Sequence, residues 1–261
     1  MKDKPLYLDK EPPVAWMIFN RPEKRNSVDL NMWQIMPKLI EDVANDRSIK
    51  VLIVRGAGEK SFVSGADISQ FKTIEFGIAD KTYDIAIGNA YAALSHLEKP
   101  VVAMIHGYCM GGGCSIALMC DLRIASDDAK FGIPAVKLGI AYSMRGTERL
   151  LNIVGPAVSA DMLLTGRVLD ANEAYHNHLI HKIVPKNQLE SFVMTYALDI
   201  AQNAPLSMAA HKMLINEMKN PSHERDMNKM KELSRRCLSS HDYVEGVTAF
   251  TEKRKPVFKG Q

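Results

Sequence analysis

Residues 99–121 read KPVVAMIHGYCMGGGCSIALMCD, and this stretch decides the fold. Val101–Ile105 is a continuous apolar run, which is typical of a strand buried on both faces. Three glycines follow at 111–113, and the apolar residues 116–119 then predict a buried helix. A strand, a glycine turn and a helix together expose backbone N–H groups at a helix N-terminus, where an anion is stabilised. Glycine also lets a ligand approach the backbone closely.

Strand and helix patterns alternate through the first two-thirds of the chain, which favours an α/β core. The last quarter is helical in pattern and suggests a cap or an oligomerisation element. We therefore predict a core over residues 1–200 and a C-terminal helical region over 201–261. Predicted strands lie at 14–19, 51–54, 101–105, 122–125, 129–133 and 183–184, and predicted helices include 30–43, 85–97, 149–154, 156–165 and 171–176. The segment LGIAYSMRGTER at 138–149 is predicted to be a loop.

Composition excludes several classes of protein. The 261 residues are 46% hydrophobic and 24% charged, with a net charge of +3, as in an ordinary globular protein. Such a mild charge without basic–aromatic clusters argues against nucleic-acid binding. The sequence predicts neither a membrane span nor a secretory signal. Four cysteines without a CxxC pair predict reduced thiols in the cytoplasm and no metal site.

A second glycine turn, SGADI at residues 64–68, also separates an extended segment from a predicted helix. Two such turns could each direct a backbone N–H at one oxygen, which makes an oxyanion hole able to stabilise the enolate of a thioester. The alternative is that the glycines only let helices pack closely against strands. The pattern alone leaves both interpretations open.

Several motifs carry a resemblance to a known family. SFVSGADISQF at 61–71 and HGYCMGGGCSIALMCDLRIAS at 106–126 resemble the enoyl-CoA hydratase/isomerase, or crotonase, superfamily. Further matches are FNRPEKRNSV at 19–28, AKFGIP at 129–134, GTERLLNIVG at 146–155 and EGVTAFTEKRKPVF at 245–258. The match covers nearly the whole chain and is specific in order and spacing.

The resemblance implies an α/β fold: a crotonase-like spiral of repeated β-β-α units with a C-terminal α-helical trimerisation region. It also implies an acyl-CoA substrate and no metal or redox cofactor, so that the coenzyme A thioester is itself the substrate. The expected assembly is a homotrimer or a dimer of trimers.

Individual residues take their implied roles from the same resemblance. The oxyanion hole would be formed by the N–H groups of Ala66 and Gly112. Phe250 and Lys253 would reach the coenzyme A from the C-terminal region, with Lys253 near a phosphate, as would Lys24 or Arg25 from the early loop. The implied lining of the coenzyme A and substrate site also includes Ser64, Gly65, Asp67, Ile68, Gly111 and Ala135.

The chain departs from the hydratase pattern at two positions. A hydratase of this family uses two glutamates to activate water and to protonate the α-carbon. Ser115 and Ala135 stand at these positions here. A serine hydroxyl without a partner is a poor general base. Standard two-glutamate hydration is therefore not expected.

The segment 138–149 suggests a different reaction. Tyr142 at this place resembles the methylmalonyl-CoA decarboxylase branch of the family, and decarboxylation needs an oxyanion hole but no strong base. Arg145 could pair with a substrate carboxylate. Each residue also has a purely structural alternative. Tyr142 could be a buried residue in the wall of the site, and Arg145 could form an ion pair with a nearby acid.

The sequence leaves two other possibilities, a binding protein without activity and a histidine metal site. A protein without the acid pair could be a non-catalytic acyl-CoA-binding subunit. His176, His178 and His181 form an HxHxxH pattern, but their side chains are not expected to converge on a metal. His178, where the family commonly has glycine, is predicted to be a turn residue.

Overall fold

The apolar run Val101–Ile105 forms a central strand of a six-stranded sheet. The structure is a computed structural model that describes residues 4–69 and 81–261. The strand order is β1-β2-β3-β5-β7-β10, in which β1 and β2 are antiparallel and the other neighbours are parallel. The strands are β1 (Leu6–Glu11), β2 (Val14–Phe19), β3 (Val51–Gly56), β5 (Val101–Ile105), β7 (Leu122–Ser126) and β10 (Lys182–Val184).

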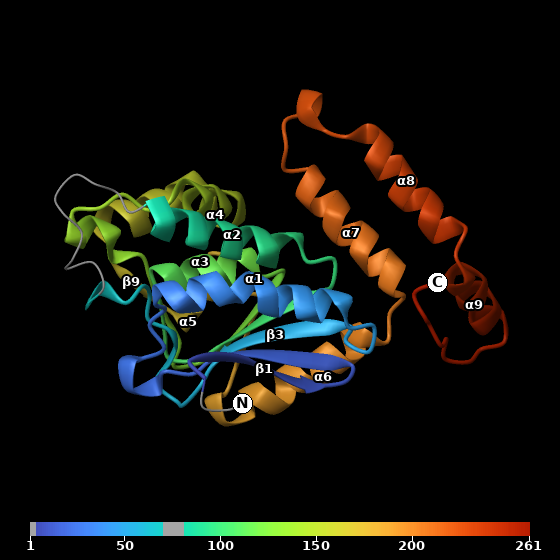
Figure 1. Ribbon diagram of the computed structural model, residues 1–261, viewed down its shortest axis with the longest axis horizontal. Coiled ribbons are helices and arrows are strands. Elements are labelled where there is room, and N and C mark those ends of the chain that lie inside the picture. The colour runs from blue at the N-terminus through green and yellow to red at the C-terminus, as the bar shows by residue number, and fades with distance from the viewer. Residues whose placement is uncertain (1–3, 70–80) are drawn as a thin grey trace.

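Helices cover both faces of this sheet, which explains why β5 is apolar throughout. On one face lie α1 (Leu30–Asn45), α2 (Lys81–His96) and α3 (Gly112–Met119), with α6 (Leu189–Ala201) on the other (Figure 1). Side chains alternate between the two cores along each strand, so Leu52 faces one and Ile53 the other.

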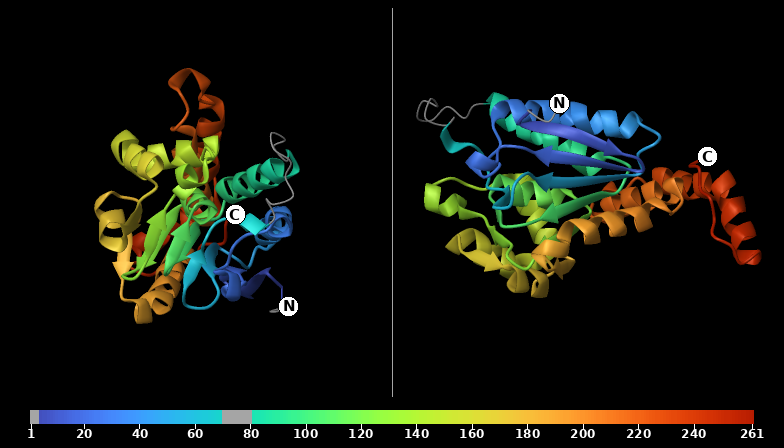
Figure 2. Two further views of the ribbon diagram at one scale, coloured as in Figure 1. Left: turned by 90° about the vertical axis from the view of Figure 1, so that its left-hand side faces the viewer. Right: turned by 90° about the horizontal axis from the view of Figure 1, so that it is seen from below.

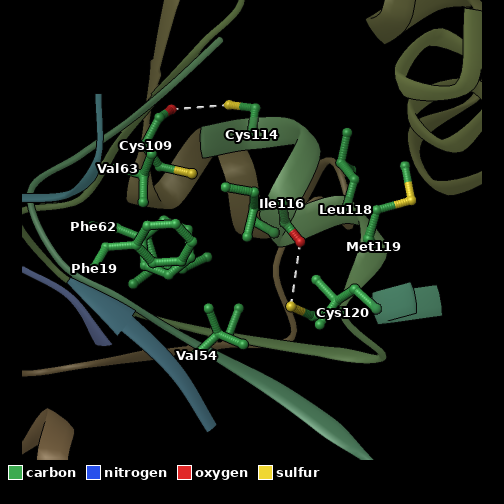
Figure 3. Packing of buried hydrophobic residues seen from close by; sticks show 14 of the residues in the cluster. Phe19, Val54, Phe62, Val63, Cys109, Cys114, Ile116, Leu118, Met119 and Cys120 are labelled. Atoms are coloured by element: carbon green, nitrogen blue, oxygen red, sulfur yellow. Dashed lines mark hydrogen bonds between the residues drawn. The ribbon is translucent and has the colours of Figure 1, made fainter. Parts of the chain in front are cut away.

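A smaller sheet brings the two glycine turns together. It is formed by β4 (Ser61–Val63), β6 (Tyr108–Met110), β8 (Lys130–Gly132) and β9 (Val168–Asp170), in that order. β4 and β6 pair in parallel, and each leads directly into a glycine turn. The buried side chains of Phe62, Val63 and Ile116 pack together between these strands and α3 (Figure 3).

The C-terminal helices extend away from the sheets. α7 (Pro205–Glu217) follows α6, and α8 (Met227–Leu238) and α9 (His241–Thr251) then form an arm that stands apart from the core (Figures 1 and 2). α7 is tied to the core through Lys212, whose Nζ lies 2.7 Å from Asp121 Oδ2 and donates to the Lys99 carbonyl oxygen at 3.0 Å. The division into residues 1–200 and 201–261 stays a prediction.

Most predicted elements are confirmed, including β2, β5 and the helix α5 (Ala171–His176). The predicted loop at 138–149 is wrong at both ends. A 3-10 helix spans Pro134–Leu138, and α4 (Met144–Thr165) begins where Ser143 Oγ accepts a hydrogen bond from Gly146 N at 3.1 Å. This is a serine N-cap, so the chain turns helical five residues earlier than the apolar pattern indicated.

The predicted break within α4 is confirmed at Gly155, whose φ of 73° interrupts the helical backbone before Pro156. β1, β6 and β9 were not predicted. Short 3-10 helices also span Pro22–Lys24, Lys186–Gln188 and Ser222–Glu224. The last two residues of the SFVSGADISQF motif lie outside the described residues. No helix in the described part of the chain combines the length and apolarity needed to cross a membrane.

Candidate functional site

The two glycine turns face each other across the end of the smaller sheet. Gly65 has a φ of 113° and Gly111 a φ of 49°, which only glycine adopts readily. A Cβ built on Gly112 would lie 3.5 Å from the Ala66 nitrogen, and one built on Gly65 would lie 3.7 Å from the Gly112 nitrogen. The backbones of Ala66 and Gly112 are therefore immediate neighbours.

The described residues provide no backbone acceptor for the N–H group of Ala66 or of Gly112. Val28 pairs with the residues on either side of Ala66, since its N–H donates to the Gly65 oxygen and its oxygen accepts from Asp67 N, both at 2.9 Å. Gly112 is the first residue of α3 and has no carbonyl one turn earlier in the helix. Within residues 4–69 and 81–261, neither N–H donates to a backbone carbonyl. The arrangement offers two donors to a single oxygen.

A cluster of hydroxyl groups lies beside this pair of donors. Ser115, on α3, is 1% exposed. Its Oγ lies 2.5 Å from the hydroxyl of Tyr142, which also donates to the Gly111 carbonyl oxygen at 3.2 Å. The side chain of Tyr91, on α2, hydrogen-bonds Ser115 as well. The serine therefore has two phenolic partners.

Burial decides how these hydroxyls behave toward protons. It raises the pKa of Tyr142 and of Tyr91 well above the ordinary value of 10.0, because a phenolate would be poorly solvated there. Both phenols therefore remain protonated at neutral pH. The cluster can donate hydrogen bonds and, to an acceptor as basic as an enolate, a proton, although burial makes each phenol a weaker acid than free tyrosine.

The predicted coenzyme A residues of the early loop lie beside the glycine turn at residues 64–68. Ser64 N donates to the Arg25 carbonyl oxygen at 3.1 Å, and Lys24 Nζ lies 3.5 Å from Asp67 Oδ2. The guanidinium of Arg25 sits over the ring of Tyr108, 5.3 Å from its centroid. The structure thus gathers Lys24, Arg25, Ser64 and Asp67 in one place.

Asp67 fixes the position of this turn. Its hydrogen bond from Ser69, followed by that from Arg21 at 2.7 Å, holds the pKa of the Asp67 carboxyl well below its usual range. Ile68, the next residue, is 55% exposed and leaves an apolar side chain at the surface. The carboxylate therefore anchors the backbone through its ion pair with Arg21.

Ala135 and Arg145 lie on neighbouring segments. Ala135 belongs to the short helix Pro134–Leu138 and packs partly buried against the main core. Arg145 is exposed on the first turn of α4, and its guanidinium donates to the Gly88 carbonyl oxygen on α2 at 3.3 Å. Among residues 4–69 and 81–261, no acid forms an ion pair with Arg145, and its pairing with a substrate carboxylate stays a prediction.

Phe250 and Lys253 are not brought to this site within one chain. Phe250 is 87% exposed on α9, and Lys253 follows that helix with a φ of 56°. The arm that carries both residues stands beyond α7, at the opposite end of the molecule from β9 (Figure 1). Their predicted role in binding coenzyme A would require a second copy of the chain.

Two further aromatic residues belong to the site but were not predicted. The ring of Trp33 lies 3.5 Å from a Cβ built on Gly112, and it packs edge-on against Tyr91 with centroids 5.5 Å apart. Trp33 Nε1 donates to the hydroxyl of Tyr83 at 3.1 Å. In the sequence both Trp33 and Tyr91 stand at positions typical of buried helix faces, and no signal separated them from the core.

The histidine pattern resolves into separate structural roles. His178 has a φ of 59°, which confirms it as a turn residue. His181 Nδ1 accepts a hydrogen bond from Arg123 N at 3.1 Å, and His176 Nδ1 lies 2.7 Å from the Asn172 carbonyl oxygen. Among the described residues, no group of three or more His, Cys, Asp or Glu side chains is placed to hold a metal ion.

Comparisons with known proteins identify the family of the chain. The family model for enoyl-CoA hydratase/isomerase matches residues 9–261. The chain is 37% identical over 250 residues to a short-chain-enoyl-CoA hydratase from Clostridium acetobutylicum, covering 96% of this chain and 95% of the relative. It is 36% identical over 258 residues to an (E)-benzylidenesuccinyl-CoA hydratase from Thauera aromatica, covering 98% and 99%.

The fold matches equally well. The crystal structure of an enoyl-CoA hydratase/carnithine racemase from Magnetospirillum magneticum superposes with a TM-score of 0.94 at 35% identity, covering 99% of this chain and 96% of that one. The crotonase-like α/β fold implied by the motifs is therefore confirmed. By sequence and by structure, the chain belongs to the enoyl-CoA hydratase/isomerase family.

Proposed function

We propose that this protein is an acyl-CoA enzyme that stabilises a thioester enolate between the N–H groups of Ala66 and Gly112. The observation that carries the proposal is the close approach of these two backbones, each with a donor that the described fold leaves unused. Family membership supports the thioester as the substrate class. Two fixed donors, one of them at the N-terminus of α3, favour an oxyanion over the neutral carbonyl from which it forms.

Two reactions use such an enolate. The relatives named above are hydratases, and their names support the addition of water across the double bond of an enoyl-CoA. Hydration places hydroxide on the β-carbon and a proton on the α-carbon. Water would need a base, and in the described part of the chain the groups bonded to Ser115 are hydroxyls and backbone, not carboxylates.

The hydroxyl cluster supports decarboxylation of a carboxyacyl-CoA as the second candidate. Here the bond between the α-carbon and the carboxylate breaks, carbon dioxide leaves, and the electron pair forms the enolate. The α-carbon then takes up a proton. No base is needed to begin, and the protonated Tyr142–Ser115 pair can donate during the second step.

The experiment compares the purified protein on crotonyl-CoA and on methylmalonyl-CoA, with loss of enoyl thioester absorbance and release of carbon dioxide as the readouts. Gly112→Pro removes the N–H at the first helical position, where proline is tolerated. We expect its turnover on the active substrate to fall roughly 10²–10³-fold. Gly112→Ala is the matched control, since it keeps the N–H and its Cβ meets only ordinary contacts at 3.5 Å.

Three results would change or overturn the proposed function. Full activity of a folded Gly112→Pro protein would show that this N–H is not the oxyanion donor. Brisk hydration of crotonyl-CoA would exclude decarboxylation as the main reaction. Tight binding of both thioesters without turnover would overturn the proposal in favour of a non-catalytic acyl-CoA-binding subunit.

A further inference from the structure

A cavity lies where α7 passes the core, and its lining does not include the residues of the two glycine turns. It has a volume of about 530 Å³ and is lined by residues from α3, β7, α4, α6 and α7. Neither Gly112 nor Tyr142 is among its lining residues. We refer to it as the α7 cavity. Its chemistry is independent of the proposed function.

Positive charge dominates the lining of the α7 cavity. Its cationic side chains are Arg123, Arg149, Lys212 and Lys219. Asp121 is the one carboxylate among the described lining residues, and it is already engaged. It forms an ion pair with Lys212 at 2.7 Å and accepts a hydrogen bond from Val101 N at 2.8 Å. The other three cations have no carboxylate partner among the described lining residues.

Arg123 and Lys219 donate hydrogen bonds to neutral oxygen atoms. Arg123 is 5% exposed, and its guanidinium donates to the carbonyl oxygens of Leu179 at 2.7 Å and Cys120 at 2.8 Å. Lys219 Nζ donates to the Asn216 amide oxygen at 2.9 Å. For Arg149, which is half-buried, the described residues provide no acceptor within hydrogen-bond or ion-pair distance.

These charges act on one another within the cavity. Burial, followed by the nearby Arg149, lowers the pKa of Lys219 to about 8, and the opposing effect of Asp121 does not restore it. Burial likewise lowers the pKa of Arg149. Desolvated cations that repel one another are costly unless an anion enters among them. The field therefore favours a negatively charged occupant.

The size and remaining lining of the cavity indicate what kind of anion fits. A volume of about 530 Å³ exceeds that of a bare inorganic ion, and apolar side chains such as Leu118, Ile153 and Ile200 line part of it. We propose that the α7 cavity binds a small organic oxyanion, a phosphate ester or a carboxylate, held by Arg149 and Lys219. Arginine offers a planar fork to such groups, and lysine a compact charge.

An anion bound in the α7 cavity would also link α7 to the core. Arg149 lies on α4 and Lys219 just beyond α7, so one anion bonded to both would bridge the two elements. A ligand that binds only the folded state raises stability by mass action. The bound anion should therefore raise the melting temperature of the full-length protein.

The test titrates the full-length protein with inorganic phosphate and, separately, with citrate, at constant ionic strength set by chloride. Calorimetry and the melting temperature are the readouts. We expect saturable binding of at least one probe, weakened about 10-fold or more in Arg149→Gln and in Lys219→Gln. Lys38→Gln is the control, because it removes the same charge from an exposed position on α1.

The phosphate and citrate arms separate the two ligand chemistries. Without either probe, Lys219→Gln should leave the melting temperature unchanged or raise it, because it removes a repelled cation; a merely structural lysine would lower it. Absence of saturable binding would overturn the proposal, as would equal weakening in Lys38→Gln. So would loss of oligomers in Arg149→Gln and Lys219→Gln in probe-free buffer, since the cavity would then hold a carboxylate of a second copy.

Discussion

Tyr142 and Ser115 show how a single contact changes the chemistry available to a residue. The two hydroxyl oxygens are 2.5 Å apart, and burial raises the pKa of Tyr142. A serine alone at this position offered no convincing acid or base. Paired with a phenol that stays protonated, it becomes part of a proton-donating group.

We expect Tyr142→Phe to lower kcat roughly 10²–10⁴-fold on the active substrate, with little change in KM, because the ring remains and the proton donor is lost. Ser115→Ala should have a similar effect, and the double variant should be no worse than either single one if the pair acts as a unit. Tyr175→Phe, at a 47% exposed position, is the control. Unchanged kcat in Tyr142→Phe would rule out the proton-donor role.

His106 provides a pH-dependent contribution to stability. It is 5% exposed, and within the described residues its Nε2 has no hydrogen-bond partner. Burial, followed by the charges of Arg55 and Lys186, lowers its pKa from the ordinary 6.5. The unfolded chain therefore binds a proton at His106 before the folded chain does. Stability is lost as pH falls through 6.5 toward the lower pKa of the folded state.

We expect His106→Asn to reduce the loss of unfolding free energy between pH 7.5 and pH 5.5. The reduction should be at most about 1.4 kcal/mol in total, because pH 5.5 lies only one unit below the ordinary pKa of 6.5. Denaturant titrations at the two pH values measure it. His223→Asn, at an exposed position, should leave the difference unchanged. An unaltered pH dependence in His106→Asn would contradict this account.

At the scale of elements, α3 owes its position to the glycines at its start. A Cβ built on Gly113 would lie 2.1 Å from the Val63 carbonyl oxygen, so α3 can pack against β4 only without a side chain there. The equivalent atom on Gly112 meets nothing closer than 3.5 Å. Both readings of the glycine run are therefore supported: Gly113 serves packing, whereas Gly112 faces Ala66.

This difference predicts that alanine at position 113 destabilises the protein much more than alanine at position 112. Gly113→Ala should lower the free energy of unfolding by about 1–3 kcal/mol or more, because the backbone of β4 must move. Gly112→Ala should change it by less than about 1 kcal/mol. Chemical denaturation of the two variants measures both. Equal stabilities would contradict the packing of α3 described here.

Element boundaries were predicted well where burial is periodic and poorly where it is not. The apolar run of β5 was enough to predict this strand, because a strand covered on both faces has no polar side. The three-residue strands β6 and β9 carry no comparable pattern, and they exist because β8 pairs with both of them. The start of α4 was missed although Ser143, its N-cap, carried a usable signal.

At the scale of the whole molecule, the arm formed by α8 and α9 exposes large apolar side chains. They include Leu238 at 64%, Val244 at 61%, Val247 at 52% and Phe250 at 87% exposure. Apolar surface gathered on one element commonly marks an interface between proteins. We expect it to be covered by a second copy of the chain, in the predicted homotrimer or dimer of trimers.

Val244→Asp and Phe250→Asp should therefore shift the protein toward monomers, because each places a charge within the contact. Light scattering after size-exclusion chromatography measures the mass. Ser239→Asp, an exposed polar position on the same arm, should leave the assembly intact. A monomeric parent protein, or an unchanged mass in both apolar variants, would contradict the prediction.

The α/β core, the two glycine turns and the absence of acids at positions 115 and 135 could all be predicted from the sequence, because burial periodicity, glycine and residue identity are local properties. The folded structure was needed to show that Ala66 faces Gly112, that Tyr91 and Tyr142 flank Ser115, and that Phe250 lies away from its own chain's site. These contacts arise because strand pairing and helix packing join residues far apart in the chain. A pattern along the chain records that a side chain is buried, but not which side chain it meets.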